Sequence, residues 1–298
     1  MSADSDCTAQ SVALDQAHSA SQSHSSSQNN LHRPDLLPPT SELSPLQHRL
    51  RSKLATIRSA ALSIAEGYRE SDEYVITSLQ QHTAKAFEDT GHVTHWAVER
   101  VEVIEEYKGT SYKQAAVPRL WNAAILCQTC CMMNYLLIGA VRRILEEEED
   151  YKEGRDSVTW HRCAIYPRLL LTKQSEIMFT PHDILQISFL GQSFVLDLTG
   201  DQFGLPDWFY KKESYEAVCV WRNVWGPETS RAMDEDDVRK QTEKDTPEAK
   251  NLPPVVDKQI SILKKKRIGM ENESAHEAEV IQDTEFRFQV WETLKYGA

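Results

Sequence analysis

The chain has 298 residues, of which 40% are hydrophobic, and its mean hydropathy is -0.52. This composition supports a real core but leaves a surplus of polar residues for tails or solvated faces. The net charge of -12 argues against general nucleic-acid binding and against docking on anionic membranes, because both need a basic surface.

The first residues lack the features of a secretory signal. Residues 1–30 contain no apolar core of the length that such a segment requires. The most apolar stretch, Ala123–Val141, carries Gln128, Thr129 and Asn134, so we interpret it as a buried helix and expect no membrane span. We therefore expect a cytoplasmic protein whose six cysteines are reduced.

The N-terminal part of the chain predicts a polar tail and then a helix. Residues 1–43 are rich in Ser, Gln, Asn and His, so we expect them to be disordered. Ser44 and Pro45 form a helix start, and Gly67 is expected to end the helix. The apolar stripe of this helix comprises Leu46, Leu50, Leu54, Ile57, Ala61 and Ile64. Its opposite face, which we interpret as solvated, carries Arg49, Arg51, Lys53 and Arg58.

Two further helices are expected before the chain changes character. One runs from about Asp72 to Phe87, whereas residues 92–107 fit either a helix or a strand. Pro118 begins a long helical stretch that ends in the acidic run Glu146–Asp150. Because acidic residues oppose the dipole at a helix C-terminus, we expect this run to fray.

The second half of the domain predicts strands. Thr159–Tyr166 and Arg168–Thr172 have β-branched or aromatic content, and Tyr215–Trp221 is a further strand candidate. Two apolar runs flank Leu190–Ser193, which predicts an antiparallel hairpin over His182–Asp197. Helices followed by an antiparallel sheet indicate an α+β fold.

These elements place one globular domain at residues 44–225, followed by a charged linker at 226–254 and a flexible tail at 255–298. The tail contains the basic cluster Lys264–Arg267, whose role as a nuclear-import or anion-contact patch is open, so the nucleus stays an alternative location. A candidate terminal helix is marked by Phe286, Val290 and Leu294.

Three residues, in the order Cys127, His182, Asp197, have the chemistry of a nucleophilic site. A thiol nucleophile needs a base to form the thiolate, and the base needs a third group to fix its tautomer. Residues on one face of a hairpin can place His182 and Asp197 as neighbours. His161 is a second candidate base.

The segment Val195-Leu-Asp-Leu-Thr-Gly-Asp-Gln-Phe-Gly204, with the strand that opens at His182, resembles the transglutaminase-like or papain-like cysteine hydrolase superfamily over about residues 120–225. The resemblance implies a papain-like core of helices packed on a small antiparallel sheet. It also implies that Cys127, which precedes Leu136-Leu137, is the nucleophile.

By the same resemblance His182 is the general base and Asp197 orients it. The implied activity is thiol-dependent acyl transfer or amide hydrolysis on a protein or peptide substrate, with no cofactor and no metal.

Other interpretations of the same residues stay open. Leu126 stands where the superfamily usually has a small residue, and Asp183 stands where it has an aromatic or aliphatic one, which favours a catalytically inactive interaction or scaffold protein on the same fold. Cys127, Cys130 and Cys131 can simply pack in the core. A zinc site at Cys127-x-x-Cys130 lacks a second ligand pair, and a purely helical regulatory protein remains an alternative.

Overall fold

A computed structural model describes residues 43–71, 74–89, 94–107, 118–173, 176–177, 181–220 and 230–270 of the chain. The predictions for the tail over residues 1–42 and for the candidate terminal helix fall outside the described residues. The side chains of the basic cluster Lys264–Arg267 are likewise outside the description.

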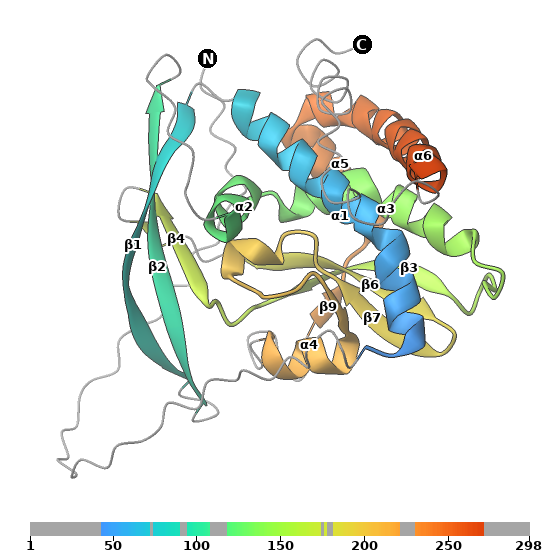
Figure 1. The fold of residues 1–298 in the computed structure, drawn as a ribbon, viewed down its shortest axis with the longest axis horizontal. Coiled ribbons are helices and arrows are strands. Elements are labelled where there is room, and N and C mark those ends of the chain that lie inside the picture. The colour runs from blue at the N-terminus through green and yellow to red at the C-terminus, as the bar shows by residue number, and fades with distance from the viewer. Residues whose placement is uncertain are drawn as a thin grey trace.

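The described residues form an α+β fold, as the sequence predicts (Figure 1). The α-helices are α1 (Pro45–Ser71), α2 (Pro118–Leu126), α3 (Cys130–Glu146), α4 (Lys212–Val218), α5 (Glu235–Asp245) and α6 (Leu252–Met270), with short 3-10 helices η2 (Gly200–Phe203) and η3 (Pro247–Asn251).

The strands form two sheets. The first sheet has the order β1 (Tyr74–Asp89), β2 (Thr94–Tyr107), β4 (Leu169–Lys173) and β5 (Glu176–Ile177), with β4 parallel to β2. The second sheet is antiparallel throughout and has the order β8 (Phe209–Lys211), β7 (Gln192–Leu196), β6 (His182–Phe189), β3 (Ser157–Cys163) and β9 (Ser230–Ala232).

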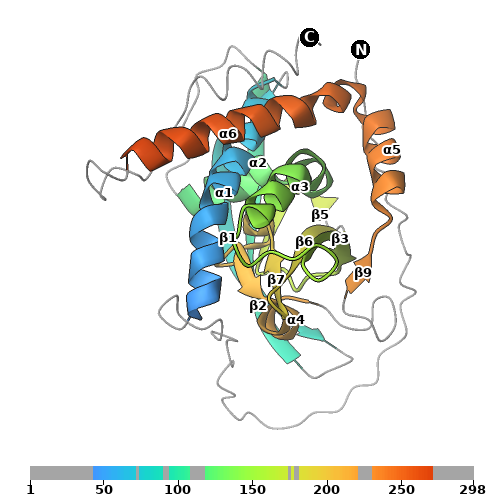
Figure 2. The ribbon, with the colours of Figure 1, turned by 90° about the vertical axis from the view of Figure 1, so that its right-hand side faces the viewer.

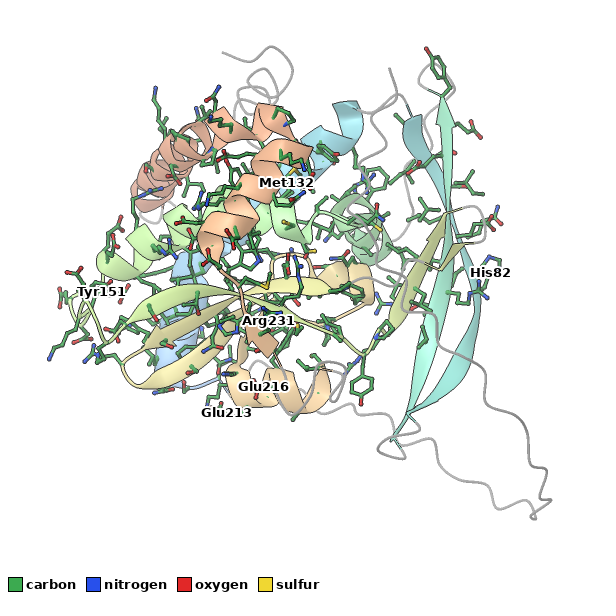
Figure 3. The ribbon with its side chains drawn as sticks, turned by 180° about the vertical axis from the view of Figure 1, so that it is seen from behind. His82, Met132, Tyr151, Glu213, Glu216 and Arg231 are labelled. Carbon is green, nitrogen blue, oxygen red and sulfur yellow. The ribbon has the colours of Figure 1, made fainter. Side chains whose placement is uncertain are left out.

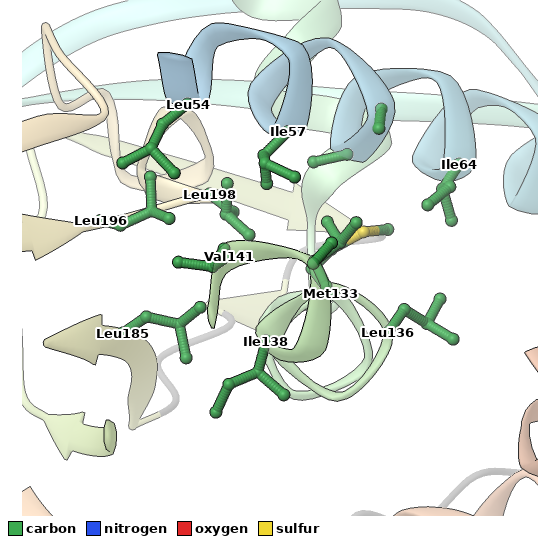
Figure 4. Close-up of a cluster of buried hydrophobic side chains, with 14 of the residues drawn as sticks. Leu54, Ile57, Ile64, Met133, Leu136, Ile138, Val141, Leu185, Leu196 and Leu198 are labelled. Carbon is green, nitrogen blue, oxygen red and sulfur yellow. The ribbon is translucent and has the colours of Figure 1, made fainter. Parts of the chain in front are cut away.

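The main core lies between the second sheet and the helices α1 and α3. The predicted stripe of α1 is confirmed: Leu54, Ile57 and Ile64 are buried and join the core that α3 and the sheet also line (Figure 4). The helix does not end at Gly67, because this glycine keeps a helical backbone instead of the left-handed conformation that ends helices.

Helix α6 covers α1 and α3 from the other side (Figure 2). Its residues Leu252, Val256 and Ile260 recur every four positions and are buried in the main core. The linker prediction for 226–254 is therefore wrong from Ser230 onward, since β9, α5, η3 and the start of α6 lie there. The flexible tail predicted from residue 255 is likewise a helix as far as Met270. In the sequence of α6, charged residues separate the apolar positions, so the helical spacing of the apolar residues was not recognised.

Two other predicted elements have a different secondary structure. The helix expected over 72–87 is strand β1, and the ambiguous segment that follows is strand β2. The strand expected at Tyr215 is the short helix α4. In β1, tertiary pairing decides against the helical pattern, because Leu79 lies opposite Val103 and both pack in a small core under α2.

The long helix expected from Pro118 is broken into α2 and α3. The N–H of Thr129 donates to the carbonyl of Leu126 across the break, and Gln128 has a φ of 61°. The two helices meet at 92°, and only as such a bent pair do they have the length and apolar composition of a membrane span; no single helix in the described ranges does.

The acidic run after α3 is held in place by α1. Glu148 is only 6% exposed and forms ion pairs with Arg49, at 3.3 Å, and with Lys53. Arg49 also reaches Asp150. These ion pairs hold Glu148 in place, so the acidic run does not fray there. The face of α1 that we interpreted as solvated is therefore partly in contact with the acidic run. Arg58 of this face is buried and pairs with Asp201.

Asp156 ties the start of β3 to the β6–β7 turn. Its carboxylate accepts hydrogen bonds from Arg155 and from the backbone N–H groups of Lys152 and Leu190. These bonds, with that of Arg155 the largest, lower the pKa of Asp156 from 3.8 to about 2.

Asp156→Asn should make stability less sensitive to acid. A folded-state pKa below the unfolded value stabilises the protein above pH 3.8, and this stabilisation is lost as the pH falls toward 2. Urea unfolding between pH 7 and pH 2 should therefore show a lower stability for the variant at pH 7 and a shallower decline below pH 4. A parallel decline in both proteins would contradict the role of Asp156.

Leu252→Ala should lower the free energy of unfolding by about 2–5 kcal/mol, because it leaves a cavity in the main core. Lys258→Ala, on the exposed side of α6, is the matched control and should change it by less than about 0.5 kcal/mol. Chemical denaturation of both full-length variants tests this. If α6 were a flexible tail, both substitutions would be neutral.

Candidate functional site

The predicted hairpin is confirmed and brings two of the three predicted site residues together. Leu190 and Gly191 form its two-residue turn with φ of 51° and 73°, which is the conformation that tight hairpins favour. The resulting register makes His182 and Asp197 diagonal neighbours on one face. His182 Nε2 lies 2.8 Å from Asp197 Oδ1, and since an ionised carboxylate only accepts, the ring nitrogen donates.

The Asp197 carboxylate is fully engaged by its surroundings. Besides His182, it accepts a hydrogen bond from the backbone N–H of Thr199 at Oδ1 and one from the Tyr215 hydroxyl, at 2.8 Å, on Oδ2. A Cβ at Gly200 would lie 2.8 Å from Oδ2, so the loop after β7 needs glycine there. Both Asp197 and His182 are 0% exposed.

The His182 ring lies on the face of the second sheet that points away from α3. Along β6, Leu185 and Ile187 face the main core with α1 and α3, whereas Ile184 belongs to a second core with Tyr215. The ring shares this second side, because its edge packs against Phe203 at a centroid distance of 4.9 Å. The helix α4 and the loop with η2 therefore enclose the His182–Asp197 pair.

Cys127, the predicted nucleophile, contacts the first sheet. It sits half-buried in the turn between α2 and α3, and its side chain packs against the small core of the first sheet, which includes Val101 and Leu171. Nε2 of His182 is hydrogen-bonded to Asp197, and Nδ1 of the same ring has no hydrogen-bond partner among the described residues. The hairpin thus brings the imidazole and the carboxylate together, and the approach of the Cys127 thiol to them stays a prediction.

The other two cysteines of this turn point in different directions. Cys130 begins α3 and is half-buried beside the backbone of Asp183, while Cys131 Sγ lies 3.3 Å from Thr242 Oγ1 of α5. Burial, and then the charge of Asp183, raises the pKa of the Cys130 thiol well above its ordinary value. None of the described cysteines forms a disulfide.

Two residues that the sequence did not single out complete the buried cluster. Cys163 is the register partner of His182 on β3 and packs in the same core as Tyr215. Burial raises the pKa of both groups well above their ordinary values, and it raises the pKa of Cys219 nearby to about 12. The register of β3 on β6 would have indicated Cys163, but Tyr215 lay in a segment predicted as a strand.

His161, the second candidate base, has no part in this cluster. Its Nδ1 lies 3.3 Å from Ser230 Oγ and its Nε2 3.1 Å from Thr159 Oγ1. Burial lowers the pKa of His161, which favours the neutral ring. It therefore contacts hydroxyl groups at the junction of β3 and β9.

A cavity of about 300 Å³ lies away from the His182–Asp197 pair, at the end of α3. It is lined by Arg142, Glu146, Tyr151 and Glu153 among others. Within the described ranges, no three His, Cys, Asp or Glu side chains are grouped so that they could hold a metal ion.

Comparison with known proteins adds no assignment: no family model, no curated protein and no solved structure matches this chain.

Tyr215→Phe should lower the free energy of unfolding by about 1–3 kcal/mol, because the buried Asp197 carboxylate loses one of its three donors. Tyr151→Phe, at the edge of the cavity, is the control and should have little effect. Urea denaturation of the two variants measures the difference. Equal stabilities would mean that the Tyr215 hydroxyl does not support Asp197.

Proposed function

We propose that this protein is a non-catalytic protein-binding domain in which the His182–Asp197 pair stabilises the fold. The observation that carries the proposal is the complete enclosure of the pair: both residues are 0% exposed, and both oxygens of Asp197 are engaged. An unidentified protein or peptide is the partner, and no substrate is turned over.

The chemistry of the described thiols supports this proposal. A nucleophilic cysteine needs a lowered pKa and a base within reach of its proton. Burial instead raises the pKa of Cys130, Cys163 and Cys219. A carbonyl substrate would also have to displace Phe203 or α4 to reach the His182 ring, since these elements pack on it.

By its resemblance to the transglutaminase-like and papain-like superfamily, the His182–Asp197 pair is the remainder of a catalytic site. In this interpretation the hairpin keeps its base and its acid, with the helix α3 preceding them in the chain. Leu126 precedes Cys127, where the superfamily usually has a small residue, and Asp183 follows His182, where it usually has an aromatic or aliphatic one. Both departures are expected to weaken catalysis. The papain-like core and the lost activity are parts of the same proposal.

A second candidate function, thiol-dependent acyl transfer, is favoured by one observation. Cys130 is the first residue of α3 and lies near Asp183, which follows His182 in the sequence. His182 Nδ1 has no hydrogen-bond partner among the described residues, so it could accept a proton. In this alternative the His182 ring turns from the α4 side of the sheet toward α3. Cys130, not Cys127, then attacks the carbonyl carbon while His182 takes the thiol proton and returns it to the leaving amine. Water or a second amine then accepts the acyl group.

Alkylation rates distinguish the two candidates. We expect iodoacetamide at pH 7 to label Cys130, Cys163 and Cys219 of the full chain more slowly than an unstructured cysteine peptide, because the raised pKa keeps all three thiols protonated and burial also covers Cys163 and Cys219. Mass spectrometry of tryptic peptides, with a denatured sample as reference, gives the rate at each position.

The enzyme alternative predicts the opposite. Cys130 would label faster than the free peptide, and His182→Ala would slow this labelling, whereas Cys127→Ala would leave it unchanged. Fast, His182-dependent labelling of Cys130 would overturn the non-catalytic proposal. Fast labelling of Cys127 alone, abolished by His182→Ala, would restore the triad that the sequence predicts.

A further inference from the structure

The long strand β1 is an edge of the first sheet. It spans Tyr74–Asp89 and pairs only with β2, whereas the opposite edge is the two-residue strand β5. In Figure 1 β1 is the outermost strand, and the β1–β2 hairpin extends past the helices. Figure 3, from behind, places His82 on this outer margin. No described strand pairs with the outer edge of β1.

Little in the sequence of β1 protects this edge. Natural edge strands usually carry charged residues or proline, which block pairing with another chain. The first eleven residues of β1, Tyr74–Ala84, include no Asp, Glu, Lys, Arg, Pro or Gly. Two register irregularities, at Ile76/Ser78 and at His82/Lys85, interrupt the pairing and leave the regular segment Ser78–His82 between them. This segment is long enough to pair with a short extended peptide.

The two faces beside this segment differ in chemistry. On the side of α2, Leu79 packs with Val103 in the small core of the first sheet. On the opposite side, Gln80 is exposed and lies directly across from Glu102, whose side chain is 38% exposed. Because side chains alternate along a strand, β2 presents Arg100, Glu102 and Glu106 on this face, and Glu102 Oε2 lies 3.4 Å from His82 Nε2. The two Glu outnumber the one Arg, so the surface next to the edge has a net negative charge.

From this arrangement we infer that β1 binds an extended peptide of alternating apolar and basic residues, which adds as a strand along Ser78–His82. Apolar side chains of the peptide extend the surface of Leu79, and its Lys or Arg side chains reach over Gln80 toward Glu102. The inference deepens the proposed binding function, because it names the surface and the chemistry of the partner.

Fluorescence anisotropy with the full chain and a labelled (Val-Lys)4 peptide tests the inference directly. We expect (Val-Lys)4 to bind and (Val-Glu)4 not to bind. Only every second residue of an added strand turns its N–H toward β1. N-methylation of one alternate set of peptide amides should therefore abolish binding, while methylation of the other set, at equal composition and charge, should preserve it.

Two pairs of variants locate the site. Gln80→Lys should weaken binding of (Val-Lys)4 by about threefold to fivefold, as expected for one exposed charge, and Gln192→Lys on β7 should not. Glu102→Gln should likewise weaken binding, whereas Glu149→Gln, in the acidic run after α3, should not.

Three results would overturn the inference: no binding of (Val-Lys)4, equal binding of the two N-methylated peptides, or equal effects of the site and control variants. The N-methylated peptides need no variant protein, so a variant that fails to fold does not decide the result. These outcomes are independent of the alkylation rates, which alone test the non-catalytic proposal.

Discussion

A single buried carboxylate organises the second half of this protein. Asp197 ends the hairpin, and its three donors come from different places: the first residue of β6, the loop after β7 and the helix α4. A buried charge without such donors would be costly, so each of these elements is constrained to the position where it reaches Asp197. The loop also needs Gly200, since a side chain there would strike the carboxylate. The enclosure of His182 follows from this arrangement.

The same loop connects the buried pair to the helical half. Arg58 of α1 reaches the carbonyl of Leu198 and the carboxylate of Asp201, both within four residues of Asp197. Burial raises the pKa of Asp201, and the charge of Arg58 partly counteracts this rise. The Arg58–Asp201 ion pair is thus partly desolvated and joins α1 to the loop after the hairpin. The functional consequence is rigidity around His182, whereas the surface that we propose for binding lies on the first sheet.

The sequence predicted features that depend on local patterns. The stripe of α1, the hairpin and the proximity of His182 to Asp197 all follow from spacings within one or two elements. Three features depended on long-range contacts and were not predicted correctly. Strand β1 takes its structure from pairing with β2, α6 is ordered by packing on α3, and the long helix expected from Pro118 is divided by the break at Gln128. A positive φ at a non-glycine residue leaves little trace in a single sequence.

The central claim is that His182 is a buried donor to Asp197 and not an accessible base. NMR spectroscopy of the full chain, with 15N-labelled histidine and His182→Gln for assignment, tests this most directly. The account predicts a His182 Nε2–H signal that is protected from exchange with water over hours. A ring proton that exchanges as fast as that of an exposed histidine would contradict it, because the pair would then be open to solvent and available for catalysis.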